Sequence, residues 1–182
     1  KVLKLDPENV PINQFAMTVV LIEGRYDEAL KIAHRLQDMD EATDLSKLFL
    51  FFEQIKRQNY ENALTDIDGL SNTGILNLIK PFFRAWIYAE LGRRDEVEQI
   101  IQEFDPESNF NFFNYYQAGL LYEYMGDLVK AEEYYSLGLA EKGLLNLRAV
   151  EAYAYSNSLQ NKEANALVIL QEYLKEAPQN EY

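Results

Sequence analysis

Cysteine is absent from the 182 residues, and histidine and tryptophan occur once each. Without cysteine the chain cannot form disulfides, thiolate zinc sites or cysteine nucleophiles. A metal site would have to be built from carboxylates and His34 alone, so we interpret His34 as a surface or half-buried side chain. Long apolar runs are also missing: residues 19–22 and 48–52 are far too short to cross a bilayer. We therefore expect no membrane insertion.

Basic residues are scarce. The chain has 17 Lys and Arg against 30 Asp and Glu, which gives a formal net charge of −13. Such a chain repels phosphate backbones and anionic lipid surfaces, so we expect no nucleic acid or membrane partner. Aromatic residues are plentiful at 13%, with 13 Tyr and 10 Phe. The composition is that of a folded, acidic chain with many aromatic side chains to place.

Catalytic motifs are absent too. Acidic clusters occur at 38–41, 66–68 and 132–133, but none has the spacing of a twelve-residue calcium loop. The phosphate-binding pattern Gly-x-x-x-x-Gly-Lys, the nucleophile pattern Gly-x-Ser-x-Gly and the dinucleotide pattern Gly-x-Gly-x-x-Gly do not occur. The sequence therefore predicts no catalytic residue, no metal and no cofactor, and we expect a protein that is not an enzyme.

A short motif recurs through the chain: a turn residue is followed five positions later by a small residue. Three successive steps are 34 residues long and the last is 35. Apolar residues on both sides of each turn recur at helical spacing, so each period predicts two helices. The turn residues are Gly24, Gln58, Gly92, Gly126 and Asn161, and the small residues are Ala29, Ala63, Val97, Ala131 and Ala166.

Five repeats follow from this period, with ten helices. Pro81 favours a start near Ile79 or Lys80 for the first helix of the third repeat. Pro7 and Pro178 occupy the same position within the repeat, which we call a column of the repeat. Residues 1–9 are therefore interpreted as the tail of a preceding repeat in a longer array. The expected repeats are 10–43, 44–77, 78–111, 112–146 and 147–180. The expected helices are 10–22, 26–36, 44–57, 60–70, 78–91, 94–104, 111–125, 127–139, 147–160 and 162–175.

A 34-residue helix–turn–helix period resembles the tetratricopeptide repeat family. A second column of small residues, Ala85, Gly119 and Ala154, supports the resemblance, whereas Met17 and Phe51 depart from it. The resemblance implies an all-α solenoid that winds into a right-handed superhelix, with the first helix of each pair on the concave face. It also implies a protein or peptide partner. Met17 and Phe51 predict looser packing in the first two repeats.

The aromatic residues fall in columns of the first helices, at spacings of 34 and 35 residues. They predict an aromatic groove that holds a peptide or protein. Some of them must instead pack between repeats, because a phase error of one residue exchanges groove for core. The groove residues are Leu48, Phe49, Phe52, Phe82, Phe83, Trp86, Tyr116, Leu120 and Tyr155.

Two other interpretations stay open. The groove could be filled by the protein's own chain or by a second copy, which would make the chain an assembly segment and a homo-oligomer. The chain could also be the adaptor region of an enzyme whose catalytic domain lies elsewhere. Residue 1 is Lys, so we expect the start of the full protein to be missing. The cell compartment is open, with the cytoplasm favoured.

Overall fold

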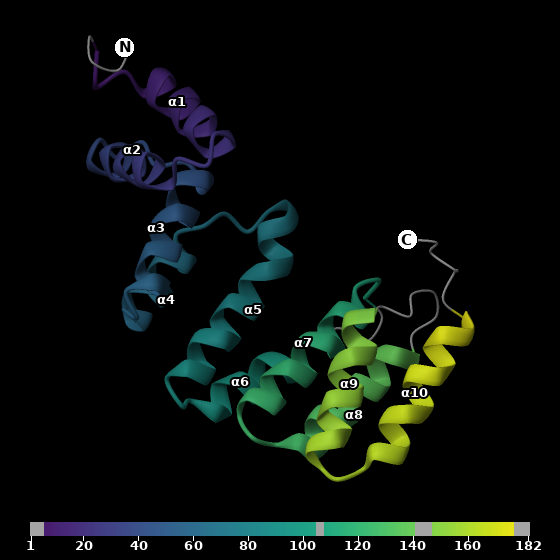
Figure 1. Ribbon diagram of the computed structural model, residues 1–182. Coiled ribbons are helices and arrows are strands. Elements are labelled where there is room, and N and C mark those ends of the chain that lie inside the picture. Colours follow the sequence, from purple (N-terminus) through teal and green to yellow (C-terminus); the bar gives the residue numbers. More distant parts are fainter. Residues whose placement is uncertain (1–5, 105–107, 141–146, 177–182) are drawn as a thin grey trace. The chain divides into compact units, whose positions relative to one another are not determined.

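The computed structural model describes residues 6–104, 108–140 and 147–176, and within these ranges it is all-helical, with ten helices and no strand (Figure 1). The helices are α1 Val10–Ile22, α2 Tyr26–Asp38, α3 Asp44–Lys56, α4 Tyr60–Asp68, α5 Gly74–Glu90, α6 Arg94–Gln102, α7 Asn111–Tyr124, α8 Leu128–Ala140, α9 Leu147–Leu159 and α10 Glu163–Glu176. The predicted all-α fold is confirmed, and the predicted helix ends lie within two residues of these bounds except at the start of α5. Residues 1–5 of the expected tail and Pro178 lie outside the described residues.

The prediction for the start of α5 was wrong. The helix begins at Gly74 and contains Pro81 in its interior. A proline removes one backbone hydrogen bond, but tertiary contacts hold the turns before it. The buried Lys80 donates from Nζ to the Leu70 carbonyl at 2.8 Å and to Asn72 Oδ1 at 2.7 Å, which fixes the preceding loop beside the first turns.

The chain forms two compact units that divide within α5, residues 1–87 and 88–182. In the first unit α1 packs against α2, α2 against α3, and α3 against α4. In the second unit α7 packs against α8, α8 against α9, and α9 against α10. Each unit is therefore a series of antiparallel helix pairs, as the repeat predicts.

All five turns within the pairs have the same backbone conformation. The turn residue has a positive φ: 72° at Gly24, 59° at Gln58, 70° at Gly92, 80° at Gly126 and 57° at Asn161. The next residue donates its N–H to the carbonyl five positions back, from Arg25 to Val20, Asn59 to Gln54, Arg93 to Tyr88, Asp127 to Tyr122 and Lys162 to Asn157, at 2.8–2.9 Å. This is the Schellman arrangement that ends helices, and glycine or asparagine suits it best. The need for a positive φ at this position explains why glycine and asparagine recur there in the sequence.

The small residues of the second helices occupy equivalent places. Each is the fourth residue of its helix and each is buried: Ala29, Ala63, Val97, Ala131 and Ala166. The sequence prediction that they are equivalent is therefore confirmed.

Helices α7 and α8 pack closely at Gly119 of α7. A Cβ at this residue would lie 2.4 Å from Cδ1 and Cε1 of Tyr135, which is fully buried on α8. The Tyr135 hydroxyl donates to Glu123 Oε2 at 3.2 Å, and burial raises the pKa of both side chains. In the first repeat the large and the small side chain change places. Met17 stands at the position of Gly119 and Ala33 at the position of Tyr135, and both are buried in one core cluster.

Candidate protein-binding face

In the second unit, the exposed side of α9 carries Tyr155 and Leu159, whose side chains are 58% and 48% exposed. On α7, 35 residues earlier, Leu120 and Tyr124 occupy the same columns, and Tyr124 is 53% exposed. Because α7 and α9 contact each other, these columns lie on one side of the unit. We name this surface the tyrosine face and define it as Phe113, Tyr116, Leu120, Tyr124, Tyr155 and Leu159.

Ring contacts hold part of the tyrosine face in place. Tyr116 is half-buried and stacks on Phe112, with ring centroids 6.4 Å apart and planes 5° apart. Its ring also lies 6.3 Å from the ring of the buried Tyr135. A side chain fixed in this way loses little entropy when a partner binds, so the face is pre-organised at Tyr116.

Sequence reasoning missed half of this face. Phe113, Tyr124 and Leu159 were not among the predicted groove residues, although Phe113 is 39% exposed and the other two are more exposed. The signal that finds them is the same repeat: Tyr124 and Leu159 stand 35 residues apart, one turn after Leu120 and Tyr155. In the first unit the equivalent positions are Ile22 and Lys56, which are not aromatic, so the aromatic pattern does not extend to them.

In the first unit, the predicted residues are packed more than the sequence suggested. Phe52 is 46% exposed, but its ring lies 5.1 Å from that of Phe51 and 5.7 Å from that of Phe83. Phe51 and Phe83 are also 5.1 Å apart, so three rings join α3 to α5. The remaining predicted residues of this unit that are half-buried are Leu48, Phe49 and Trp86.

Phe82 does not lie on an exposed face. Its side chain is only 6% exposed, in line with the buried Ala85 and Ala89 three and seven residues later. The placement of Phe82 in an open groove is therefore corrected: it belongs to the buried stripe of α5, while its neighbour Phe83 turns toward Phe51 and Phe52.

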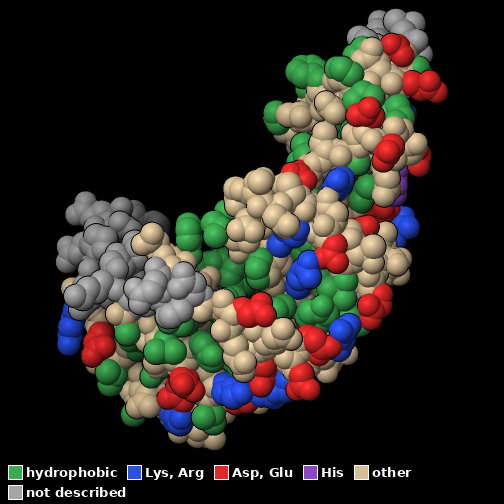
Figure 2. Space-filling view, turned by 180° about the vertical axis from the view of Figure 1, so that it is seen from behind, with side chains coloured by type: hydrophobic (Ala, Val, Ile, Leu, Met, Phe, Trp, Pro, Cys, Tyr) green, Lys and Arg blue, Asp and Glu red, His purple; other side chains and the backbone are tan. Residues whose placement is uncertain are grey.

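Charged side chains link the second helices into a network. Glu98 Oε1 on α6 accepts from Lys130 Nζ at 3.0 Å and from Arg94 Nε at 2.9 Å, and Arg94 also pairs with Asp127. Hydrogen bonds from Lys130 and Arg94 hold the pKa of Glu98 below its ordinary 4.5. On the face shown in Figure 2, blue Lys and Arg side chains lie among red Asp and Glu side chains. The ion pairs of Glu98 and Arg94 join α6 to α8.

His34 is exposed and pairs with a buried carboxylate. Its Nε2 lies 2.7 Å from Glu53 Oε2 on α3, and Arg57 Nη2 lies 2.6 Å from the other oxygen of Glu53. The histidine thus links α2 to α3. In the part of the chain that the structure describes, no group of three or more His, Cys, Asp and Glu side chains could hold a metal ion. No described helix is both long and apolar enough to cross a membrane.

The paired helices, the repeated turn and the equivalent buried residues define the tetratricopeptide type of helical-repeat fold. The chain is similar to the crystal structure of MamA, with a TM-score of 0.63 at 16% identity over 93% of this chain and 92% of that one. A MamA structure from Desulfovibrio magneticus RS-1 gives a TM-score of 0.69 at 11% identity, over 95% and 97% of the two chains. PilW, described as a widely conserved type IV pilus biogenesis factor, gives 0.70 at 13% identity, over 98% of this chain and 83% of PilW. No protein-family model matches the sequence, and no curated protein is significantly similar to it.

Proposed function

We propose that this chain is a protein-interaction module and that the tyrosine face binds a segment of a partner protein. The observation that carries the proposal is the exposure of Phe113, Tyr124, Tyr155 and Leu159, between 39% and 58%, on the two contacting helices α7 and α9. Contiguous exposed apolar side chains on a folded chain mark interaction sites.

The chemistry of the face indicates the kind of partner. Tyrosine offers a large rigid ring with a polar hydroxyl, and tyrosine is enriched among residues that dominate interface energies. On α7 and α9, the charged side chains in these columns are Arg148 and Glu151, both exposed on α9 and of opposite sign. The expected partner segment therefore presents apolar or aromatic side chains, with polar backbone groups for the tyrosine hydroxyls.

The first unit offers the matching position one period earlier. Phe52 and Trp86 stand in the column of Leu120 and Tyr155, and Phe52 is 46% exposed. We propose that Leu48, Phe49, Phe52, Phe83 and Trp86 form a second binding surface, which belongs to the first unit alone. Phe82 is left out because it is buried.

The structural likeness fits an interaction role. PilW is described as a type IV pilus biogenesis factor. A chain with the same fold and an exposed aromatic face suits a role in which proteins are held. At 13% identity the likeness concerns the fold, so the partner has to be identified by experiment.

A displayed library of random peptides, selected on the full chain, tests the proposal. We expect the selected peptides to bind Tyr155→Ala about thirtyfold more weakly, which corresponds to about 2 kcal/mol for a hot-spot side chain. Tyr26→Ala is the matched control, because Tyr26 is 64% exposed on α2 and lies outside both proposed surfaces. Fluorescence anisotropy measures the affinities, and thermal unfolding shows that both variants stay folded.

Three results would contradict the proposal. Selected peptides could bind Tyr155→Ala as tightly as the parent, or they could lose affinity on Tyr26→Ala instead. Sedimentation could also show that Tyr155→Ala converts a dimer to a monomer, which would assign the face to a second copy of the chain.

A further inference from the structure

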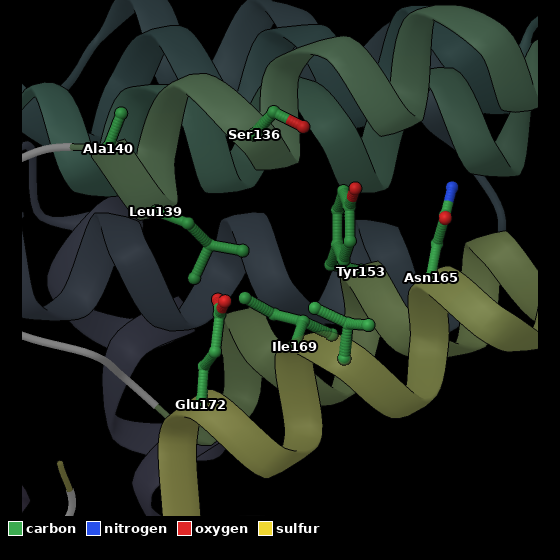
Figure 3. A pocket seen from close by; sticks show the side chains of 8 residues that line it. Ser136, Leu139, Ala140, Tyr153, Asn165, Ile169 and Glu172 are labelled. Atoms are coloured by element: carbon green, nitrogen blue, oxygen red, sulfur yellow. The ribbon is translucent and has the colours of Figure 1, made fainter. Parts of the chain in front are cut away.

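A separate pocket lies between α8 and α10 in the second unit, with Tyr153 of α9 between the two helices (Figure 3). Its volume is about 470 Å³, within the range of pockets that hold ligands. None of its lining residues belongs to the tyrosine face. The lining includes Ser136, Leu139, Tyr153, Asn165, Ile169 and Glu172.

The pocket has an apolar middle and two polar ends. Leu139 and Ile169 point into it from opposite helices, and the carboxylate of Glu172 points toward Leu139 at one end (Figure 3). Asn165 stands two helical turns before Glu172, about 10 Å along the axis, and marks the other end. An elongated ligand with an apolar stem fits this arrangement.

The charge at the pocket is negative. Among the described residues, Glu172 forms no ion pair within 4.0 Å. Asn165 Nδ2 donates to Asn157 Oδ1 at 3.4 Å, which leaves the Asn165 carbonyl oxygen as an acceptor. The whole chain has a net charge of −13, which attracts basic partners and repels acidic ones. The pocket therefore offers acceptors and a carboxylate, which suits a cation.

We propose that this pocket binds a lysine or arginine side chain of a partner protein. The methylene stem lies between Leu139 and Ile169, as the stems of long basic side chains do on apolar surfaces. The cationic end reaches the Glu172 carboxylate and makes a charge-assisted hydrogen bond. Ser136, Tyr153 and Asn165 accept hydrogen bonds from the partner's backbone. This contact is independent of the tyrosine face.

The test uses the isotope-labelled full chain and NMR titration with the blocked peptide acetyl-Leu-Lys-Leu-amide. We expect amide shifts at 136–140 and 165–172. The same peptide with norleucine in place of lysine should bind about fivefold more weakly, the scale of one partly exposed ion pair. Glu172→Gln should weaken the lysine peptide by a similar factor. Glu163→Gln removes the same charge at the start of the same helix and should leave binding unchanged.

Each alternative occupant gives its own result. Equal affinity for the lysine and norleucine peptides would overturn the proposal in favour of an apolar ligand. Pocket shifts that appear in the chain alone as its concentration rises would assign the pocket to a second copy. Shifts at Tyr155 and Leu159, or none at millimolar peptide, would also overturn it. Tyr155→Ala should leave binding of the lysine peptide unchanged, which separates this proposal from the function of the tyrosine face.

Discussion

Gly119 has no side chain because the ring of Tyr135 fills the space that one would need. Gly119→Ala places a Cβ 2.4 Å from two ring carbons of a fully buried residue. Overpacking of this kind costs about 1–3 kcal/mol. We expect the free energy of unfolding, measured in urea, to fall by that amount despite the better helix propensity of alanine.

Two further variants check that explanation. Gly138→Ala is the control, because its Cβ would meet Tyr115 Cβ at 3.4 Å, an ordinary contact. Tyr135→Ile combined with Gly119→Ala removes the ring that the new Cβ would meet, and should recover part of the loss. A double variant that is no more stable than Gly119→Ala would show that the ring is not the cause.

Gln58 is the turn residue least suited to its conformation. Its φ is 59°, a region that costs a residue with a Cβ about 1–2 kcal/mol. Glycine avoids that cost but gains freedom in the unfolded chain, so Gln58→Gly should raise the free energy of unfolding by about 0.5–1 kcal/mol. Gly92→Ala should lower it by about 1 kcal/mol, since nothing lies within 4 Å of its Cβ position and only the φ of 70° opposes the change. Chemical denaturation of both variants measures the two signs, and equal signs would refute the argument.

At the scale of the element, α6 and α8 are joined through Glu98. Because the pKa of Glu98 is lowered by Lys130 and Arg94, its contribution to stability is complete above its ordinary pKa of 4.5 and is lost as pH falls through the lower folded value. Glu98→Gln should therefore cost about 0.5–1 kcal/mol at pH 7 and much less at pH 3. Urea denaturation across this range measures the difference. Glu133→Gln, with an exposed carboxylate outside the network, should not change the slope, and a Glu98→Gln profile parallel to that of the parent would contradict the prediction.

The ends of the elements show what local sequence determines. The second helix of each pair starts directly after a Schellman turn, and Asn9 and Thr43 cap α1 and α3, because these signals act within a few positions. The start of α5 was missed because Lys80 contacts Leu70 and Asn72 across the preceding loop. Sequence spacing does not reveal such a contact.

At the scale of the whole molecule, the repeat predicts the fold, because a 34-residue period brings the same residue types to the same place in each pair. The candidate site follows from it only in part. Phe82 and Phe83 are neighbours in sequence, yet one is buried and the other joins a ring cluster, and a helical period cannot separate them without knowledge of the neighbouring helices. The repeat boundaries and the absence of nucleic-acid binding, expected from the charge of −13, stay predictions.

The central claim is that α7 and α9 present the binding surface, and hydrogen exchange of the full chain with and without a selected peptide tests it most directly. The face consists of residues on these two helices, so a bound peptide should slow exchange of their amides more than that of α8 and α10. Protection that spreads from Phe113 to Leu159 along α7 and α9 is the predicted result. Exchange that stays unchanged in α7 and α9 while another part of the chain becomes protected would contradict the account.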